Sequence, residues 1–133
     1  MLEGSCLCGA VHYQVNAEAG PIIHCHCQTC RKAHASAFSS LMPVSREAFD
    51  WTSGEELLTA FQSSPGKYRH FCKVCGSQLL AERENQPTVM LRLGCLDTPI
   101  TTRPLAHIWR SDCADWYDPG LDLPSFPEGI PPQ

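Results

Sequence analysis

Cysteines in close groups constrain this chain more than any other feature. Nine cysteines occur among its 133 residues, and seven of them fall in three clusters. The clusters are Cys6-x-Cys8, Cys25-x-Cys27-x-x-Cys30 and Cys72-x-x-Cys75. A tight turn can aim two such sulfurs at one point, and tetrahedral Zn²⁺ binds cysteine sulfur at about 2.3 Å. We therefore expect a fold built around metal.

Seven cysteines divide naturally into four ligands and three. A set of four thiolates would close one tetrahedral site, whereas a set of three leaves a fourth position for water, a substrate or a histidine. The spacing favours two sets: Cys6, Cys8, Cys72 and Cys75; and Cys25, Cys27 and Cys30. Other pairings stay open, including a single zinc with a redox-active middle cluster, or a second site closed by His24 or His26.

Charge and hydropathy exclude several classes of function. Lys and Arg total 10 against 14 Asp and Glu, and no basic run exists, so nucleic acid is not an expected partner. The opening residues, MLEGSCLCG, lack the charged and apolar regions of a signal peptide. No apolar run approaches the ~20 residues of a membrane helix. We expect no membrane association and a cytoplasmic location, where clustered cysteines indicate metal or catalysis before disulfides.

Short strand signals dominate the rest of the sequence and predict a mainly β fold. Turn signals such as TSGE at 52–55 and SSPGK at 63–67 separate them. Helical pattern is confined to a short segment after Cys27 and about one turn at 45–49, with Ser45 as its N-cap. The predicted strands are 11–15, 36–44, 56–61, 67–71, 77–82, 88–96 and 105–110.

No repeat or linker divides the chain, so we expect a single domain over residues 1–133. The segment from Asp118 holds five of the eleven prolines and predicts an extended C-terminal tail lying over the surface.

Five motifs in this order resemble the glutathione-dependent formaldehyde-activating (GFA) family, also called the centromere-protein-V-like domain. They are GSCLCGAVHYQV, CHCQTCRKAHASAF, SSPGKYRHFCKVCGSQL, LGCLD and HIWRSDCADWYD. One departure from the family pattern is Ala35, at a position where a glycine is expected more often. The other departures are Cys95 and Cys113.

The resemblance implies a β-tent fold, with short strands in small sheets around two zinc ions. It implies a structural zinc on Cys6, Cys8, Cys72 and Cys75, and a second zinc on Cys25, Cys27 and Cys30 where the family binds its thiol substrate. The implied activity is that of a carbon–sulfur lyase acting on glutathione, or a similar thiol, and formaldehyde or another aldehyde.

Three thiolates make zinc a weak Lewis acid but leave it ready to accept a fourth soft ligand, such as a substrate thiol. We expect Cys27, His26 and Arg31 to contact that substrate, with Arg31 or Lys32 holding a carboxylate. Proton transfer would fall to His24, His26, His70 or His107. Alternatives are a non-catalytic zinc-stabilised binding module and a redox sensor; a homodimer is possible in each case.

Overall fold

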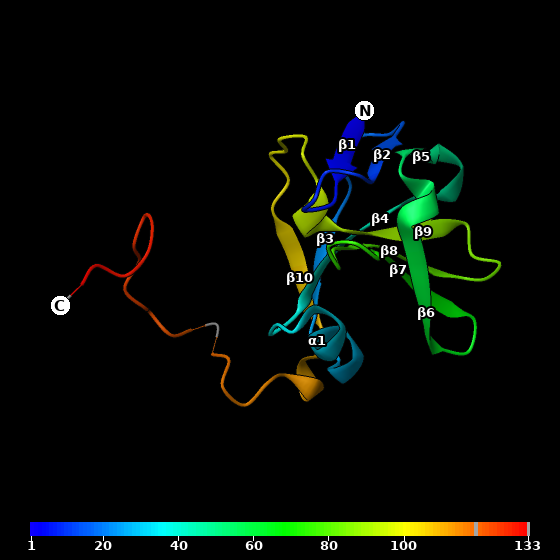
Figure 1. Ribbon diagram of the computed structural model, residues 1–133. Coiled ribbons are helices and arrows are strands. Elements are labelled where there is room, and N and C mark those ends of the chain that lie inside the picture. Colours follow the sequence, from blue (N-terminus) through cyan, green and yellow to red (C-terminus); the bar gives the residue numbers. More distant parts are fainter. Residues whose placement is uncertain (119, 133) are drawn as a thin grey trace.

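A computed structural model describes residues 1–118 and 120–132. Within these residues the chain forms mostly strands, one short α-helix, α1 (Gln28–His34), and four 3₁₀ turns (Figure 1). The strands are β1 (Leu2–Ser5), β2 (His12–Val15), β3 (Ile22–Cys25), β4 (Ser39–Ser45), β5 (Phe49–Ser53), β6 (Leu58–Ser64), β7 (Lys67–Cys72), β8 (Gln78–Arg83), β9 (Thr88–Arg92) and β10 (Pro104–Ile108). The 3₁₀ turns are η1 (Arg46–Ala48), η2 (Glu55–Leu57), η3 (Leu93–Cys95) and η4 (Arg110–Asp112).

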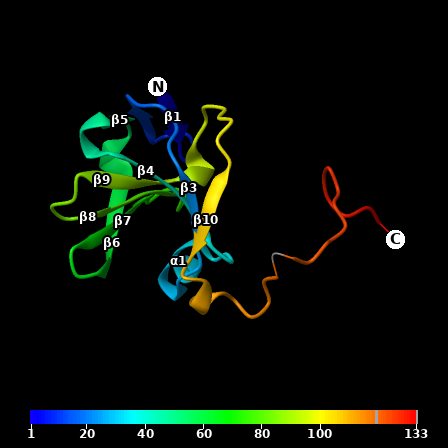
Figure 2. The same cartoon turned by 180° about the vertical axis from the view of Figure 1, so that it is seen from behind.

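The strands form two sheets. The smaller has the order β1-β2-β5, and the larger has the order β10-β3-β4-β9-β8-β7-β6. All neighbours pair antiparallel except β10 and β3, which are parallel, with His107 opposite His24. Strand β10 comes from the far end of the chain, so its pairing ties the closing segment to the strand that carries Cys25. Helix α1 lies at the lower end of β3 and β10 in both views (Figures 1 and 2).

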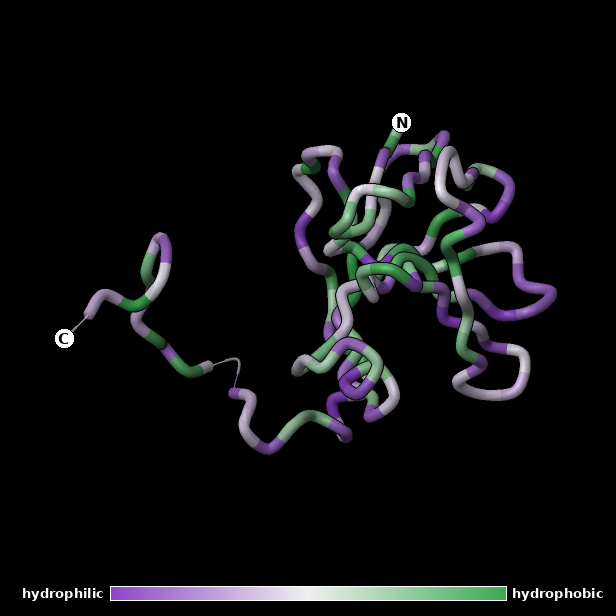
Figure 3. The backbone as a smooth tube through the Cα atoms, in the orientation of Figure 1, coloured by the Kyte–Doolittle hydropathy of each residue, from purple (hydrophilic) through white to green (hydrophobic). Residues whose placement is uncertain are grey.

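The main core lies between the two sheets. Its buried members come mainly from β1, β2, β4, β8 and β9, with one residue each from β3 and β7, and they include Tyr13, Met42, Leu79 and Leu91. Cys6 and Cys72 belong to the same cluster, so the cysteine loops are anchored in the core. Hydrophobic residues accordingly concentrate along the central strands, and the protruding turns are hydrophilic (Figure 3).

The mainly β prediction is confirmed, and each predicted strand overlaps an observed one. Strand β1, strand β3 and strand β5 were not predicted. The turn expected at 45–49 is the 3₁₀ turn η1, and Ser45 occupies its N-cap position as predicted, although its side chain makes no capping hydrogen bond. Ser45 is also the last residue of β4, where it pairs with Thr88 of β9.

The tail from Asp118 leaves the body of the protein, and its described residues are exposed (Figures 1 and 2). The expectation that it lies over the surface was wrong. It carries several exposed apolar side chains but lacks the strand or helix that would fix it against a neighbour. Among the helices of the described residues, none has the length and apolarity needed to cross a membrane.

Candidate metal sites and the adjoining cavity

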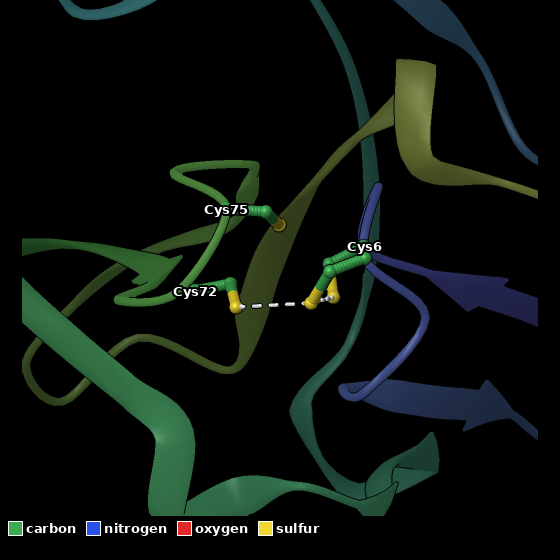
Figure 4. A group of neighbouring side chains, drawn as sticks. Cys6, Cys72 and Cys75 are labelled. Atoms are coloured by element: carbon green, nitrogen blue, oxygen red, sulfur yellow. Dashed lines mark hydrogen bonds between the residues drawn. The ribbon is translucent and has the colours of Figure 1, made fainter.

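The first and third cysteine clusters meet in space. Cys6 and Cys8 lie on the loop after β1, Cys72 is the last residue of β7, and Cys75 lies on the turn that follows. Figure 4 shows Cys6, Cys72 and Cys75 pointing toward one another. The four Sγ atoms lie within 4.8 Å of one another. The Sγ atoms of Cys6 and Cys8 are 3.5 Å apart, and those of Cys8 and Cys72 are 3.9 Å apart. Zn–S bonds of about 2.3 Å at tetrahedral angles place sulfurs about 3.8 Å apart, so this four-cysteine cluster fits a zinc ion.

Two glycines close the loops that carry these sulfurs. Gly9 and Gly76 have φ angles of 80° and 79°, a left-handed conformation that glycine adopts without steric cost. The amide of Gly9 donates to the carbonyl of Cys6, and that of Gly76 to the carbonyl of Cys72. The glycines after each pair therefore fold the chain back, as their positions in the sequence predict.

Ser77 links the two loops of the four-cysteine cluster. Its Oγ accepts a hydrogen bond from the backbone amide of Leu7 at 2.9 Å and lies 3.3 Å from the Sγ of Cys75. Hydrogen bonds from the side chain and backbone of Ser77 lower the pKa of the Cys75 thiol to about 5. The serine that trails the third cluster thus favours the thiolate that a metal requires.

The middle cluster forms a separate triad, Cys25, Cys27 and Cys30, with all three Sγ atoms within 4.8 Å. Cys25 ends β3, and Cys27 is the N-cap of α1, where its Sγ accepts a hydrogen bond from the amide of Cys30 at 3.3 Å. The strand–turn–helix sequence therefore directs all three sulfurs to one point. The triad also fits a metal ion, and the described residues add no fourth His, Cys, Asp or Glu ligand to it.

Arg69 is the charged partner of the triad. Its side chain is 2% exposed, and its Nη atoms lie 3.7 and 3.8 Å from the Sγ of Cys30. Its Nε donates to the Oγ of Ser63 at 3.0 Å. Hydrogen bonds from Cys25 foremost, and also from Ser39, Cys27 and Arg69, hold the pKa of the Cys30 thiol far below its usual range.

A cavity of about 580 Å³ opens beside the triad, a size typical of small-molecule sites. Its apolar wall comes from Ile23, Leu41, Pro43, Met90 and Ile108. Its charged wall comes from strands β7, β8 and β9 and the turn after β10, and contains Lys67, Arg69, Arg83, Arg92 and Asp112. Sequence reasoning did not find this wall, because these residues lie scattered between positions 67 and 112 of the sequence without a local motif.

The predicted proton-transfer histidines lie elsewhere. His26 is fully buried, with its Nε2 2.7 Å from the Nδ1 of His107, and its ring packs near Phe38 and Tyr117. His24 Nδ1 is 3.0 Å from the Oγ of Ser40. His70 Nε2 is 3.4 Å from a carboxylate oxygen of Glu82. Among the described residues that line the cavity, none is a histidine.

The expected carboxylate-binding residues are also displaced from the cavity. Cys27 lines it, but neither Arg31 nor Lys32 does. Lys32 instead lines an adjoining hollow with Phe61, and that hollow shares Ser63 and Arg69 with the cavity. The substrate contacts assigned to His26 and Arg31 stay predictions that this geometry does not support.

The fold and the two clusters define a mainly β protein with two cysteine sites that could bind metal ions. The chain belongs to the glutathione-dependent formaldehyde-activating enzyme family, whose model matches residues 1–112. The resemblance noted from the motifs is thereby confirmed.

Individual relatives agree with this membership. A protein of Halomonas elongata described as a putative glutathione-dependent formaldehyde-activating enzyme is 30% identical over 128 residues, covering 89% of this chain and 80% of its own. An uncharacterized lyase of Schizosaccharomyces pombe is 35% identical over 77 residues, or 58% of this chain, and the match spans about half (54%) of that relative. A crystal structure of a Rhodobacter sphaeroides protein shares the fold, with a TM-score of 0.65 and 21% identity, over 79% of this chain and 98% of that one.

Proposed function

We propose that this protein is a zinc-dependent carbon–sulfur lyase that forms or cleaves the adduct of a thiol, such as glutathione, with formaldehyde or another aldehyde. The observation that carries the proposal is the triad. Three sulfurs converge within 4.8 Å, beside a cavity, without a fourth ligand from the described residues. The descriptions of the Halomonas and Schizosaccharomyces relatives agree in kind with this activity.

A zinc ion held by the triad would supply a binding position at which a substrate thiol loses its proton. The cavity walls would hold the thiol and the aldehyde next to each other. The sulfur lone pair forms the new C–S bond to the carbonyl carbon, and the C=O π electrons move to oxygen. That oxygen takes up the proton lost by the thiol. Nothing is oxidised or reduced, and cleavage is the reverse reaction.

The four-cysteine cluster has a structural role in this proposal. Two of its members, Cys6 and Cys72, are part of the main core, and its ligand set would be complete with four thiolates. We propose one zinc at each site. A single domain over residues 1–133 and a homodimer stay predictions.

The alternative of a closed, non-catalytic second site has less support. It needs His24 or His26 as the fourth ligand, and both imidazoles are engaged with Ser40 and His107 instead. The redox-sensor alternative makes no use of the cavity.

Thiols add to formaldehyde without a catalyst, so a test of the activity must compare rates rather than detect the product. Exchange NMR measures such rates. The measurement is the rate of interconversion of ¹³C-formaldehyde and its S-hydroxymethyl adduct with glutathione, with and without the zinc-loaded protein. We expect the protein to accelerate the exchange and Cys27→Ser to abolish the acceleration. The matched control is Cys95→Ser, which changes a half-buried cysteine outside both clusters. An exchange rate that is the same with and without the wild-type protein would refute the proposal.

A further inference from the structure

Arg92 is a buried cation whose Nε has no hydrogen-bond partner among the described residues. The residue is 3% exposed, and the opposite charges that act on it are those of the triad sulfurs. Burial lowers the pKa of Arg92, which is the signature of a charge removed from water. A buried charge without a partner is costly, so such a group normally has a function or a ligand.

The other charges near Arg92 do not satisfy it. Arg69 already faces the triad through Cys30, and a zinc ion with three thiolates carries a net charge of only −1. One arginine is enough to balance that charge. The cavity wall adds Lys67 and Arg83, against the single carboxylate of Asp112. Positive charge therefore exceeds negative charge beside the triad.

Lys67 strengthens the case for an anionic ligand. It is half-buried on the same cavity wall, and burial, followed by the charge of Arg69, lowers the pKa of its amine. The charges of Arg69 and Arg92 both act on Lys67, and cations gathered along one low-dielectric cavity wall create a potential that favours an anion. Arg92 also borders a second hollow of about 400 Å³ near His34, but that hollow lacks a further lysine or arginine.

We infer that Arg92, together with Lys67, binds a carboxylate of the thiol substrate while the thiol itself reaches the triad. The substrate class is thus an anionic thiol, and neutral or cationic thiols are disfavoured. This inference rests on the proposed function, because it places the sulfur of the ligand at the cysteines. It assigns carboxylate recognition to strands β7 and β9 rather than to Arg31 and Lys32 on α1.

Two thiols of similar size give the cleanest probe of this subsite. They are 3-mercaptopropionate, which carries one carboxylate, and the neutral 2-mercaptoethanol. Calorimetric titration of the full-length, zinc-loaded protein would give the ratio of their affinities. We expect the wild type to bind 3-mercaptopropionate at least ten times more tightly, since a charge-assisted pair to arginine contributes at least that factor.

Variants at Arg92 separate a binding role from a structural one. Arg92→Gln is expected to bring the affinity ratio close to one by weakening 3-mercaptopropionate alone, and Arg92→Lys to retain part of the preference. Arg103→Gln is the matched control, because Arg103 is exposed and bonds only to the carbonyls of Thr101 and Thr102. Unchanged binding of 2-mercaptoethanol reports that a variant is folded. If Arg92→Gln fails this check, Lys67→Gln and a titration with rising NaCl should each reduce the ratio.

The outcomes distinguish this inference from the proposed reaction. A wild-type ratio near one, or a preference that survives in Arg92→Gln, would overturn the carboxylate subsite even if the exchange of formaldehyde is accelerated. A strong carboxylate preference without any acceleration would leave the subsite standing and refute the lyase. Failure of both thiols to bind would overturn both.

Discussion

Both terminal nitrogens of the Arg69 guanidinium lie within 3.8 Å of the Sγ of Cys30. This contact joins the middle of β7 to the first turn of α1, across 39 positions of the sequence. It places a full positive charge at a cluster of thiolates inside the protein. The triad therefore interacts electrostatically with the sheet, and its stability depends on a residue outside the cysteine motifs.

Replacing Arg69 should therefore strongly destabilise the folded protein. Arg69→Gln is expected to lower the free energy of unfolding by about 3 kcal/mol, because it breaks the buried contact between the guanidinium and the Sγ of Cys30. Arg69→Lys should recover part of the loss, since lysine keeps the charge but not the fork of donors. Urea unfolding of the zinc-loaded protein measures both. The control is Ser63→Ala, which removes only the hydrogen-bond partner of Arg69 Nε and should cost about 1 kcal/mol. An equal loss of stability in Arg69→Gln and Ser63→Ala would contradict the charge argument.

Loss of the four-cysteine cluster should unfold the protein, whereas loss of the triad should not. Structural zinc contributes on the order of 10 kcal/mol to small zinc domains, and Cys72 is fully buried in the main core. We expect Cys72→Ser to lose the folded circular dichroism spectrum. Cys27→Ser should stay folded and contain about one zinc fewer than the wild type by metal analysis. A folded Cys72→Ser protein with undiminished zinc would contradict the structural role.

The C-cap of α1 carries a residue that is poorly suited to it. Ala35 has φ 48° and ψ 47°, in the left-handed region, and its amide donates to the carbonyls of Arg31 and Lys32. Glycine adopts this conformation without a steric penalty, so Ala35→Gly is expected to raise the free energy of unfolding by about 1 kcal/mol. The same change inside the helix, Ala33→Gly, should instead cost about 1 kcal/mol. Urea denaturation curves of the two variants measure whether each change raises or lowers the free energy of unfolding.

Acid should weaken the protein through His34. Its Nε2 is buried without a partner among the described residues, and burial, followed by the charge of Arg92, lowers its pKa to about 4. Protonation then favours the unfolded chain, whose histidine has a pKa near 6.5. Stability is thus intact above about pH 6.5 and is lost as the pH falls toward 4.

The variant His34→Gln isolates this contribution. Relative to the wild type, it should gain about 1 kcal/mol of unfolding free energy between pH 7.5 and pH 5.5, after allowing for screening at a half-buried site. Zinc content should be measured at each pH, so that both proteins are compared in the same metal state. A constant difference across this range would show that His34 does not titrate as described.

The cysteine spacing predicted the two groups of sulfurs because each of the three cysteine motifs is local and the ligand count has few solutions. The glycines at 9 and 76 were informative for the same reason. The cavity was not predictable, because Arg69 and Arg92 meet only through the register of β7, β8 and β9. Strand β3 was missed because its four residues, IIHC, run into the cysteine motif, and β5 because its first residue overlaps the segment expected to be helical. The parallel pairing of β10 with β3 leaves no local signal at all.

The two clusters differ in how far apart along the chain their ligands lie. The triad is complete within six consecutive residues, whereas Cys8 and Cys72 are 64 positions apart. Short loops close at little entropic cost, so an unfolded or newly made chain can gather the triad at once. The other cluster must wait until β7 has been made and has paired. When zinc is scarce, the order in which the two sites fill during folding would therefore be set by loop length, and the proposed catalytic site would receive its metal before the proposed structural site.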